Sequence, residues 1–311
     1  MTAARGGRIT GWGTALPEKV LTNADLENML DTTDAWITER SGIKERRIGG
    51  TTAGLAVEAG VQALATAGLQ PSDIDMLVLA TTTPDQTVPA TSAAVQHEIG
   101  LRCGAFDLNA ACSGFVYALV AANGFLVQGM ERVLVIGSET LSRITDWEDR
   151  STAVLFGDGA GAVVLEAADP TRVLSWDLGT DGSARPLLYA DLGGTLEMEG
   201  REVFRRAVRV MVDSGLRSIQ RAGVTVDDIA LVVPHQANIR IIEAANQRLG
   251  IPMERTAIVL HRTGNTSSAS IPLALVDAIE TGRLKPGDLM LLVGFGAGMT
   301  WASAVVRWDG A

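Results

Sequence analysis

Short apolar runs of strand length alternate with longer amphipathic segments of helix length along this chain. The apolar runs are rich in β-branched and aliphatic residues, as buried strands are, and they cover 75–80, 105–108, 132–137, 229–233 and 289–294. Apolar positions with helical spacing cover 34–41, 54–67, 113–128, 201–222, 238–248 and 270–281. Strands that alternate with helices predict an α/β layered fold.

The pattern repeats at about half the length of the chain. Four segments of the first half have counterparts about 150 to 157 residues later: 73–78 and 228–233, 99–101 and 249–251, 117–119 and 273–275, and 135–137 and 292–294. Chance similarity between buried strands is the alternative explanation. The ordered set predicts a pseudo-twofold protein with its site between two βαβ-rich halves, which we place at 1–167 and 168–311.

Composition and charge narrow the classes of function. With 47% hydrophobic and 20% charged residues, the chain is too apolar to be disordered. It has neither an apolar run of about 18 residues that could span a membrane nor the apolar stretch of a signal peptide, so we expect a soluble cytoplasmic protein. A net charge of −10 argues against nucleic acid as a partner.

The positions of the cysteines and histidines predict neither a disulfide nor a metal site, so any chemistry must come from side chains without a metal. The two cysteines, Cys103 and Cys112, flank a predicted strand that holds them beyond the roughly 7 Å limit for a disulfide. The three histidines form no Cys-x-x-Cys or His-Glu-x-x-His pattern, so no metal site is predicted.

Cys112 is a candidate nucleophile. It lies where a predicted strand ends and a helix begins at Ser113. The unpaired N–H groups and the dipole of a helix N-terminus favour a thiolate, the form that attacks carbonyl carbon. The alternative is an inert buried cysteine.

His235 and Asn265 are candidates from the second half. His235 directly follows a predicted strand that ends at Pro234, and open α/β sheets place their sites at the carboxyl ends of strands. Asn265 lies in a turn-rich stretch before a predicted helix, where a capping or turn role is the alternative.

Two glycine-rich loops, 157–161 and 294–298, suggest nucleotide binding at first sight. A dinucleotide site needs a helix after the glycines, but the residues that follow both loops have the pattern of strands. The glycines are therefore expected to let backbone approach a reacting centre.

Together these features resemble one family of condensing enzymes, the β-ketoacyl-acyl-carrier-protein synthases III, which initiate bacterial fatty-acid synthesis. The resembling segments are 23–27, 31–37, 41–47, 107–115, 156–161, 200–204, 234–238, 264–267 and 294–301. The resemblance implies an α/β fold, the thiolase-like five-layered αβαβα sandwich of two duplicated halves. The first half would carry the nucleophilic cysteine and the second the His/Asn pair.

The resemblance also implies a decarboxylative Claisen condensation. Cys112 would take an acyl group from acyl-CoA, and malonyl-acyl-carrier protein would then lose carbon dioxide and attack the acyl-cysteine. His235 and Asn265 would donate hydrogen bonds to the malonyl thioester oxygen, and the N–H groups of Cys112 and Ala297 would form the oxyanion hole. The family commonly has glycine at position 297. No tightly bound cofactor is implied, because CoA and phosphopantetheine thioesters are substrates.

By the same resemblance, further residues would bind these substrates. Trp36 and Arg150 would sandwich the CoA adenine, Arg40 would contact a phosphate, and Asn238 and Gly200 would line the pantetheine tunnel. Ordinary surface packing is the alternative for Trp36 and Arg40.

The acyl pocket is expected at Val88 and Phe295. Val88 matches a position that closes the pocket across a homodimer, where some relatives have phenylalanine, so its small side chain suggests a primer longer than acetyl or branched. The segment 187–198, which helps to cover the pocket in the family, is shorter than expected, and this leaves the primer and the pathway open.

Arginines on two predicted helices are candidates for docking an acidic carrier protein. They are Arg205, Arg206 and Arg209, with Arg201 on the same helix, and Arg240 and Arg248 on the next helix. The alternative is that they only solvate helix surfaces.

Other functions remain as alternatives. A priming ketosynthase or acyltransferase of a specialised polyketide pathway would share the site. A papain-like cysteine hydrolase also uses Cys, His and Asn, but its signature around the cysteine is missing here. A non-catalytic binding subunit is disfavoured because all three residues are retained. Thiolases carry a second cysteine where this chain has Phe295, and elongating ketosynthases carry two histidines.

Overall fold

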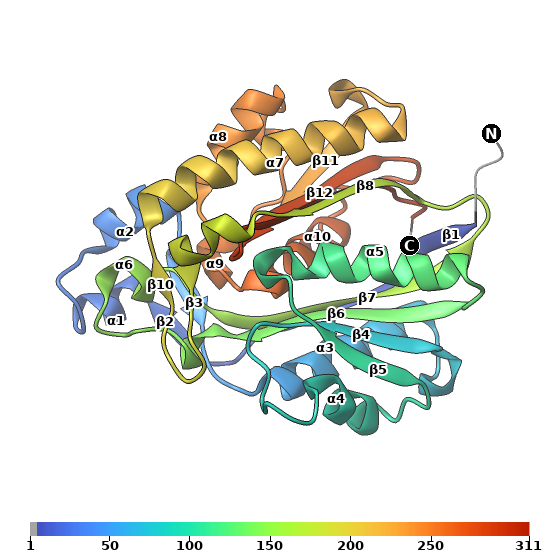
Figure 1. Ribbon diagram of the computed structural model, residues 1–311, viewed down its shortest axis with the longest axis horizontal. Helices are drawn as coiled ribbons and strands as arrows, with labels where there is room; N and C mark the ends of the chain where they lie inside the picture. The colour runs from blue at the N-terminus through green and yellow to red at the C-terminus, as the bar shows by residue number, and fades with distance from the viewer. Residues whose placement is uncertain (1–4, 311) are drawn as a thin grey trace.

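Five layers of helices and sheets make up the computed structural model, which describes residues 5–310 (Figure 1). The outer helices α3 (Thr52–Ala67) and α4 (Thr91–Ile99) cover the first sheet. The central helices α5 (Gly114–Val127) and α10 (Ser270–Glu280) lie between the two sheets. The outer helices α7 (Gly200–Ala222) and α8 (Ile239–Leu249) cover the second sheet. This arrangement confirms the predicted five-layered αβαβα sandwich.

The two sheets share one strand order, which supports the predicted duplication. In spatial order, the first contains β1 (Gly6–Ala15), β7 (Asp158–Ala168), β6 (Arg132–Thr140), β4 (Met76–Ala80) and β5 (Gly104–Leu108). The second contains β8 (Val173–Thr180), β13 (Thr300–Arg307), β12 (Leu289–Gly296) and β11 (Ile229–Pro234). In the first sheet β1–β7 and β7–β6 are antiparallel pairs and β6–β4 is parallel. In the second sheet the equivalent pairs β8–β13 and β13–β12 are antiparallel and β12–β11 is parallel. The counterpart of β5 is reduced to one parallel bridge between Val232 and Thr256.

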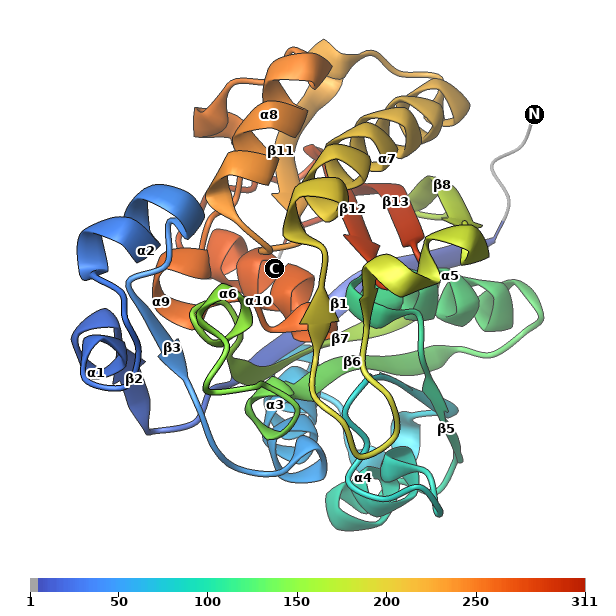
Figure 2. The ribbon, with the colours of Figure 1, turned by 60° about the vertical axis from the view of Figure 1, so that its left-hand side comes forward.

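Smaller elements lie at one end of the sandwich. They are β2 (Val20–Thr22), α1 (Asn23–Glu27), α2 (Asp34–Ser41), β3 (Glu45–Arg47), α6 (Arg150–Ala153), α9 (Leu260–Thr263) and the hairpin β9 (Leu188–Tyr189) and β10 (Glu197–Met198). Figure 2 shows this hairpin extending from the start of α7 toward the first sheet.

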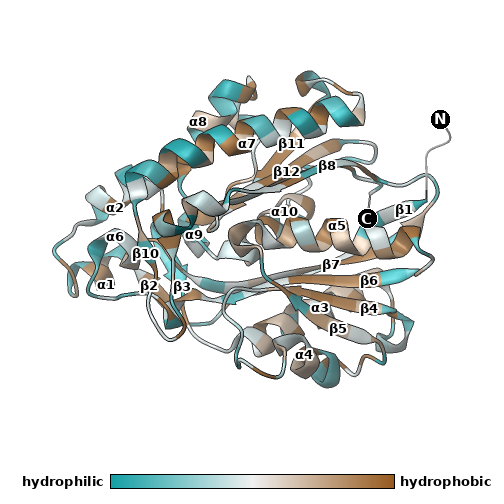
Figure 3. Ribbon diagram, viewed as in Figure 1, coloured by the Kyte–Doolittle hydropathy of each residue, from teal (hydrophilic) through white to brown (hydrophobic). Residues whose placement is uncertain are grey.

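Three apolar cores hold the layers together. One surrounds the central helices and contacts both sheets, and one lies beneath the outer helices on each side. β12 is buried along its whole length, because helices cover both faces of its sheet, and this explains its continuous apolar run. The central helix α5 is apolar on nearly all sides, whereas α7 has a polar outer face (Figure 3). A helix between two sheets has no face toward water, but an outer helix has one.

Most predicted elements are present, with ends that differ by a few residues. The strands expected after both glycine loops are confirmed as β7 and β13. The predicted division at 167/168 falls at the end of β7, although the two halves share the core around α5 and α10. β1 was not predicted, because glycines interrupt its apolar pattern. A Cβ at Gly11 or Gly13 would lie 2.2 or 2.3 Å from a carbonyl oxygen of α3, so the glycines allow this helix to pack on the strand.

No helix in the part of the chain that the structure describes is long and apolar enough to cross a membrane.

Candidate active site

A cavity of about 960 Å³ lies between the two halves and contains most of the predicted site residues. Cys112 comes from the turn between β5 and α5, His235 from the end of β11, and Asn265 from the segment between α9 and α10. The turn after β12 adds Ala297. Strands and helices far apart in the sequence thus bring the Cys-His-Asn set into one cavity.

Cys112 lies in a tight turn that needs special backbone geometry. A short 3₁₀ turn, Ala111–Ser113, precedes α5, and Ala111 has a φ of 50°. Left-handed backbone is strained for a residue with a side chain and is often found at functional sites. A Cβ at Gly296 would lie 2.5 Å from the Cys112 nitrogen, so this glycine allows the end of β12 to approach the nucleophile.

The resting form of Cys112 differs from the sequence-based expectation. Burial raises the pKa of its thiol to about 12, with a smaller contribution from the negative charge of Glu139, while a hydrogen bond from the Ser267 hydroxyl acts in the opposite direction. The helix N-terminus alone was expected to favour a thiolate. Desolvation is the largest cause of this shift, because burial disfavours the charged form of a thiol. With this pKa, Cys112 is a thiol at neutral pH.

His235 is a neutral imidazole in this site. It follows β11, and its backbone N–H continues the pairing with β12 by donating to the Val293 carbonyl at 2.8 Å. Its ring packs edge-on against Phe295, with centroids 5.5 Å apart. Burial lowers the pKa of the ring to about 3, so the imidazole has one N–H donor and no charge at neutral pH.

One end of the Asn265 side-chain amide is hydrogen-bonded within the protein. Its backbone bridges to Phe156, and its Oδ1 accepts a hydrogen bond from the Ser267 N–H at 2.9 Å. Ser267 has a φ of 47°, the second strained residue beside the cysteine. The turn role considered for Asn265 is therefore real, and it directs the carbonyl oxygen to the loop. The amide NH₂ is the end left for a substrate oxygen.

Glu139 is a structural residue of the site that the sequence did not identify. It is fully buried at the end of β6 and accepts hydrogen bonds from Thr82, Thr83 and Ser268. Thr82 and Thr83 follow β4 in the first half, whereas Ser268 adjoins Ser267 in the second. Glu139 thus ties the loop that carries Asn265 to the half that carries Cys112. Its location at the end of a buried strand was the only available signal.

The predicted CoA-binding residues gather at the mouth of the cavity. Trp36, Arg40, Gly200 and Asn238 line it. Asn238 donates to the Arg40 carbonyl at 2.9 Å and caps α8 by accepting from the Arg240 N–H. These contacts connect α2 of the first half with α8 of the second.

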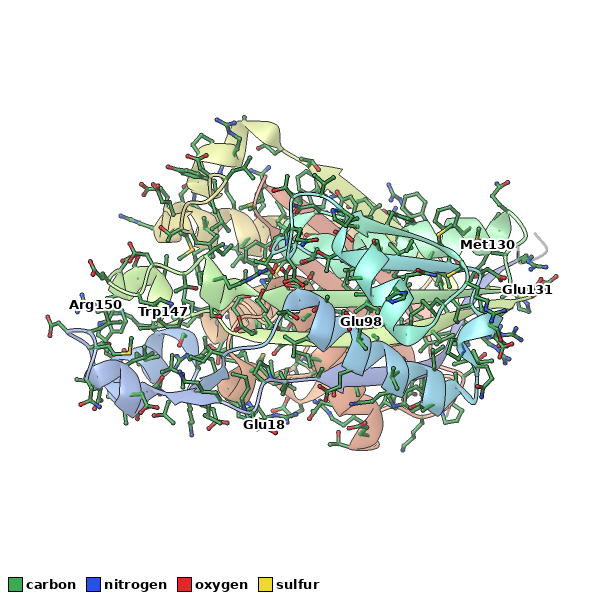
Figure 4. All side chains as sticks on the ribbon, turned by 90° about the horizontal axis from the view of Figure 1, so that it is seen from below. Glu18, Glu98, Met130, Glu131, Trp147 and Arg150 are labelled. Carbon is green, nitrogen blue, oxygen red and sulfur yellow. The ribbon has the colours of Figure 1, made fainter. Side chains whose placement is uncertain are left out.

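Arg150 lies on Trp36 outside the cavity lining. The two guanidinium groups of Arg40 and Arg150 lie 4.4 and 4.8 Å from the Trp36 ring centroid. A base stacked between Trp36 and Arg150 needs a gap of roughly 7 Å, about two van der Waals contacts, so the pair must open to admit an adenine. Figure 4 shows Arg150 at the outer edge of the molecule. Its guanidinium also donates to the Asp31 carbonyl at 2.7 Å, and the movement would break this hydrogen bond.

The apolar wall of the cavity combines residues of the 187–198 segment, which was expected to cover the pocket, with others that were not predicted. They are Leu141, Ile144, Leu155, Phe156, Leu188, Leu196 and Met198, besides the predicted Phe295. Leu188 is the first residue of β9 and Leu196 directly precedes β10. The Leu196 N–H donates to the Ile144 carbonyl at 2.8 Å. The short 187–198 segment therefore still covers the cavity.

Val88 lies apart from the cavity of its own chain. Its side chain is 81% exposed in a loop before α4, and it is not among the lining residues. Val88 therefore forms no part of the cavity wall of its own chain.

The candidate docking arginines differ in their ion pairing. Arg205 and Arg206 both pair with Glu202 at 2.7 Å, and Arg209 lies 3.7 Å from Asp213. The two arginines lower the pKa of Glu202 to about 2. Much of the positive charge on α7 is therefore balanced within the helix, which the sequence reasoning did not include.

Metal and disulfide chemistry are not indicated by the described residues. Within residues 5–310 no group of three or more His, Cys, Asp or Glu side chains could hold a metal ion. Cys103 and Cys112 are both free, as predicted.

Comparison with known proteins gives one consistent family. Family models described as 3-oxoacyl-acyl-carrier-protein (ACP) synthase III and its C-terminal part match residues 106–182 and 219–308. A β-ketoacyl-acyl-carrier-protein synthase III of Roseiflexus castenholzii is 52% identical over 97% of this chain and 98% of its own.

Comparison with solved structures indicates the same family. The 3-oxoacyl-acyl-carrier-protein synthase III of Aquifex aeolicus is 47% identical, with a TM-score of 0.96 over 97% of this chain and 100% of its own. The priming β-ketosynthase of the R1128 polyketide biosynthetic pathway is 36% identical, with a TM-score of 0.95 over 100% of this chain and 98% of its own. The likeness to both covers the whole thiolase-like fold.

Proposed function

The chain belongs to the β-ketoacyl-acyl-carrier-protein synthase III family of condensing acyltransferases, and we propose that it joins an acyl-CoA primer to malonyl-acyl-carrier protein to initiate fatty-acid synthesis. The observation that carries this proposal is the convergence of Cys112, His235 and Asn265 in one cavity, whose lining thus contains one thiol and two neutral side chains that can donate hydrogen bonds. A cytoplasmic location agrees with the two free thiols and with these substrates.

In the first half-reaction Cys112 takes the acyl group. Its sulfur attacks the acyl-CoA carbonyl, the bond to the CoA sulfur breaks, and the thiol proton goes to that sulfur, so acyl-cysteine and free CoA thiol are formed. Because the pKa of the Cys112 thiol is about 12, the proton leaves as attack proceeds and not beforehand. The backbone N–H groups of Cys112 and Ala297 are the proposed donors to the tetrahedral oxyanion.

In the second half-reaction the malonyl thioester loses carbon dioxide. The electron pair of the broken C–C bond moves into an enolate whose oxygen accepts hydrogen bonds from His235 and Asn265. Neutral donors suit this step, because they stabilise the developing charge without giving up a proton. The enolate carbon then attacks the acyl-cysteine, the C–S bond breaks, and the Cys112 sulfur leaves as a thiolate that takes up a proton from solvent water.

Intact-protein mass spectrometry after mixing with acyl-CoA tests this proposal. A synthase retains a stable acyl adduct on Cys112 and releases it as product only when malonyl-acyl-carrier protein is added. Continuous release of free acid without the malonyl substrate would indicate a hydrolase. No adduct with any primer would indicate a binding protein.

A priming ketosynthase of a polyketide pathway remains the second candidate. It is favoured by the likeness to the R1128 enzyme over the full chain and by the short hairpin over the acyl pocket. A series of acyl-CoA primers assayed with malonyl-acyl-carrier protein identifies the preferred starter unit and so tests which pathway the enzyme serves.

We also propose that the working form is a homodimer. β5 lies at the edge of the first sheet with one side unpaired, and sheet edges are sites of strand pairing between chains. The loop with the exposed Val88 lies near this edge, after β4 and before α4. A partner's cavity would bury this apolar side chain.

Val88→Phe should narrow the acyl pocket of the partner subunit. The larger ring fills space in a closed apolar tunnel, and this should lower kcat/KM for longer or branched primers by roughly 10-fold or more while sparing acetyl-CoA. Val61→Phe, on the outer helix α3, is the matched control, because Val61 is also exposed but lies far from the cavity. Equal loss for every primer would show that Val88 does not form the pocket wall.

The carrier-protein surface is proposed on α7 and α8, beside the cavity mouth. Arg205, Arg206, Arg209 and Arg248 line a groove of about 630 Å³ between these helices. Arg240 and Arg248 are exposed and have no ion-pair partner within residues 5–310. Unpaired arginines give local attraction for an acidic partner despite the net charge of −10 and can bind a phosphate bidentately.

Reversing the charge of both unpaired arginines, Arg240→Glu with Arg248→Glu, should raise the KM for malonyl-acyl-carrier protein several-fold. The effect should be larger at low salt, where screening is weak, while Cys112 acylation by free acyl-CoA stays nearly intact. Arg307→Glu is the control, because this exposed residue ends β13 at the end opposite the cavity-lining Thr300. Unchanged carrier-protein kinetics in the double variant at low ionic strength would place the docking surface elsewhere.

A further inference from the structure

His235 has a buried serine as the partner of one ring nitrogen. Its Nδ1 lies 2.6 Å from the hydroxyl oxygen of Ser270, the first residue of α10. Ser270 is 1% exposed and lies behind the cavity wall, since it is not a lining residue. Nε2, on the opposite side of the ring, is therefore the nitrogen available to a substrate.

The direction of this hydrogen bond follows from a third group. The backbone N–H of Gln236 donates to the same Ser270 oxygen, at 3.3 Å. Within residues 5–310 this oxygen has no other hydrogen-bond partner, so Nδ1 is the single acceptor for the hydroxyl hydrogen. If Nδ1 carried the ring proton instead, the buried hydroxyl hydrogen would have no acceptor, which is costly away from water.

Gln236 is itself fixed by four hydrogen bonds. Its side-chain NH₂ donates to the carbonyls of Pro234 and Ala257 at 2.7 and 3.1 Å. Its Oε1 accepts from the N–H groups of Val259 and Leu260 at 2.9 and 3.3 Å. Two acceptors at one end and two donors at the other allow only one orientation of the amide.

These contacts connect the two donors of the site. The segment held by Gln236 leads through α9 directly to Asn265, and Gln236 follows His235 in the chain. Gln236 is fully buried and does not line the cavity. It therefore acts as a brace between the turn with His235 and the segment with Asn265, beyond the end of β11.

We propose that Ser270, held by the Gln236 backbone, fixes the ring proton of His235 on Nε2, and that the Gln236 side chain fixes the spacing of His235 and Asn265. Ser270 and Gln236 are positioning residues, because neither touches the substrate. The tautomer is a property of the folded protein alone. Its consequence, an N–H aimed at the malonyl thioester oxygen, rests on the proposed condensation.

The tautomer can be measured directly by NMR on protein labelled with ¹⁵N-histidine. Long-range ¹H–¹⁵N correlations distinguish the two neutral forms of a ring, and only three histidines contribute. Single His97→Gln and His261→Gln variants assign the His235 signals by elimination. We expect His235 to carry its proton on Nε2 in the wild type and to lose this uniform form in Ser270→Ala. A proton on Nδ1 in the wild type, or an unchanged spectrum in Ser270→Ala, would overturn the proposal.

Kinetics give the functional half of the test. Ser270→Ala should slow malonyl decarboxylation roughly 10-fold or more, by weakening one donor to the enolate, while Cys112 acylation continues. Ser270→Thr keeps the hydroxyl and should restore the rate. Ser214→Ala is the matched control, since it removes a buried hydroxyl that bonds Ser303 beneath α7, away from His235. Equal losses in Ser270→Ala and Ser270→Thr, or in Ser214→Ala, would contradict a positioning role.

The two readouts separate failure of this inference from failure of the proposed function. A protein that shows the Nε2 tautomer but condenses no primer would contradict the proposed function alone. A protein that condenses normally with the proton on Nδ1 would contradict this inference alone.

Discussion

Cys112→Ser should abolish acylation by acyl-CoA and reduce condensation on the order of 10⁴-fold or more, as loss of a nucleophile does in other enzymes. A serine hydroxyl is much harder to deprotonate than a thiol. The site adds to this difficulty, because burial already raises the pKa of the more acidic thiol to about 12. Intact mass after incubation with acyl-CoA, together with the rate of product formation, measures both effects.

Cys103→Ser is the control for Cys112→Ser. Cys103 is the only other cysteine in the sequence, and it lies just before β5 at the other end of that strand. This variant should acylate like the wild type with one acyl group per chain. An acyl adduct that persists in Cys112→Ser and disappears in Cys103→Ser would exclude Cys112 as the nucleophile.

His235→Ala and Asn265→Ala should each slow malonyl decarboxylation by roughly 10²-fold or more, the usual cost of removing one donor to a developing oxyanion. Acylation of Cys112 should continue, because the proposed donors for that step are backbone N–H groups. Release of carbon dioxide from malonyl-acyl-carrier protein and burst acylation from acyl-CoA measure the two half-reactions separately. A loss that falls chiefly on acylation would contradict this division of roles.

Asn265→Asp is a sharper test of the same step. Aspartate keeps an oxygen to accept from the Ser267 N–H, so the strained loop beside Cys112 retains its hydrogen bond. It replaces the amide NH₂ by an oxygen that repels an enolate. We expect decarboxylation to fall at least as far as in Asn265→Ala. Near-normal decarboxylation in Asn265→Asp would mean that the asparagine acts only on the loop.

Much of the fold was predictable because it depends on local periodicity. Apolar runs of strand length predicted β4, β6, β11 and β12, and helical spacing predicted α3, α5, α7, α8 and α10. The half-length repeat predicted two similar sheets. β1 was not predicted because four glycines dilute its pattern. Two of them, Gly11 and Gly13, allow close contact with α3, which is a tertiary reason.

Residues of the candidate site were predictable where their position at the end of a helix or strand indicates their role. Cys112 before a helix and His235 after a strand needed no knowledge of distant contacts, and both line the cavity. The apolar wall was not predictable in the same way. Leu188 and Leu196 belong to a hairpin too short to give a pattern, and their place over the cavity depends on a hydrogen bond to the distant Ile144.

The sequence by itself determined which groups are present and at which end of a strand or helix each one stands, because these follow from neighbours along the chain. Only the tertiary structure decided their chemical state. Cys112 is a thiol because folding removes its water, and His235 meets Ser270, 35 positions away, at Nδ1. The charges of Arg205 and Arg206 are partly balanced by Glu202 because their side chains converge on it. Protonation and charge depend on desolvation and on neighbouring groups in space. The periodicity of a sequence contains information on neither.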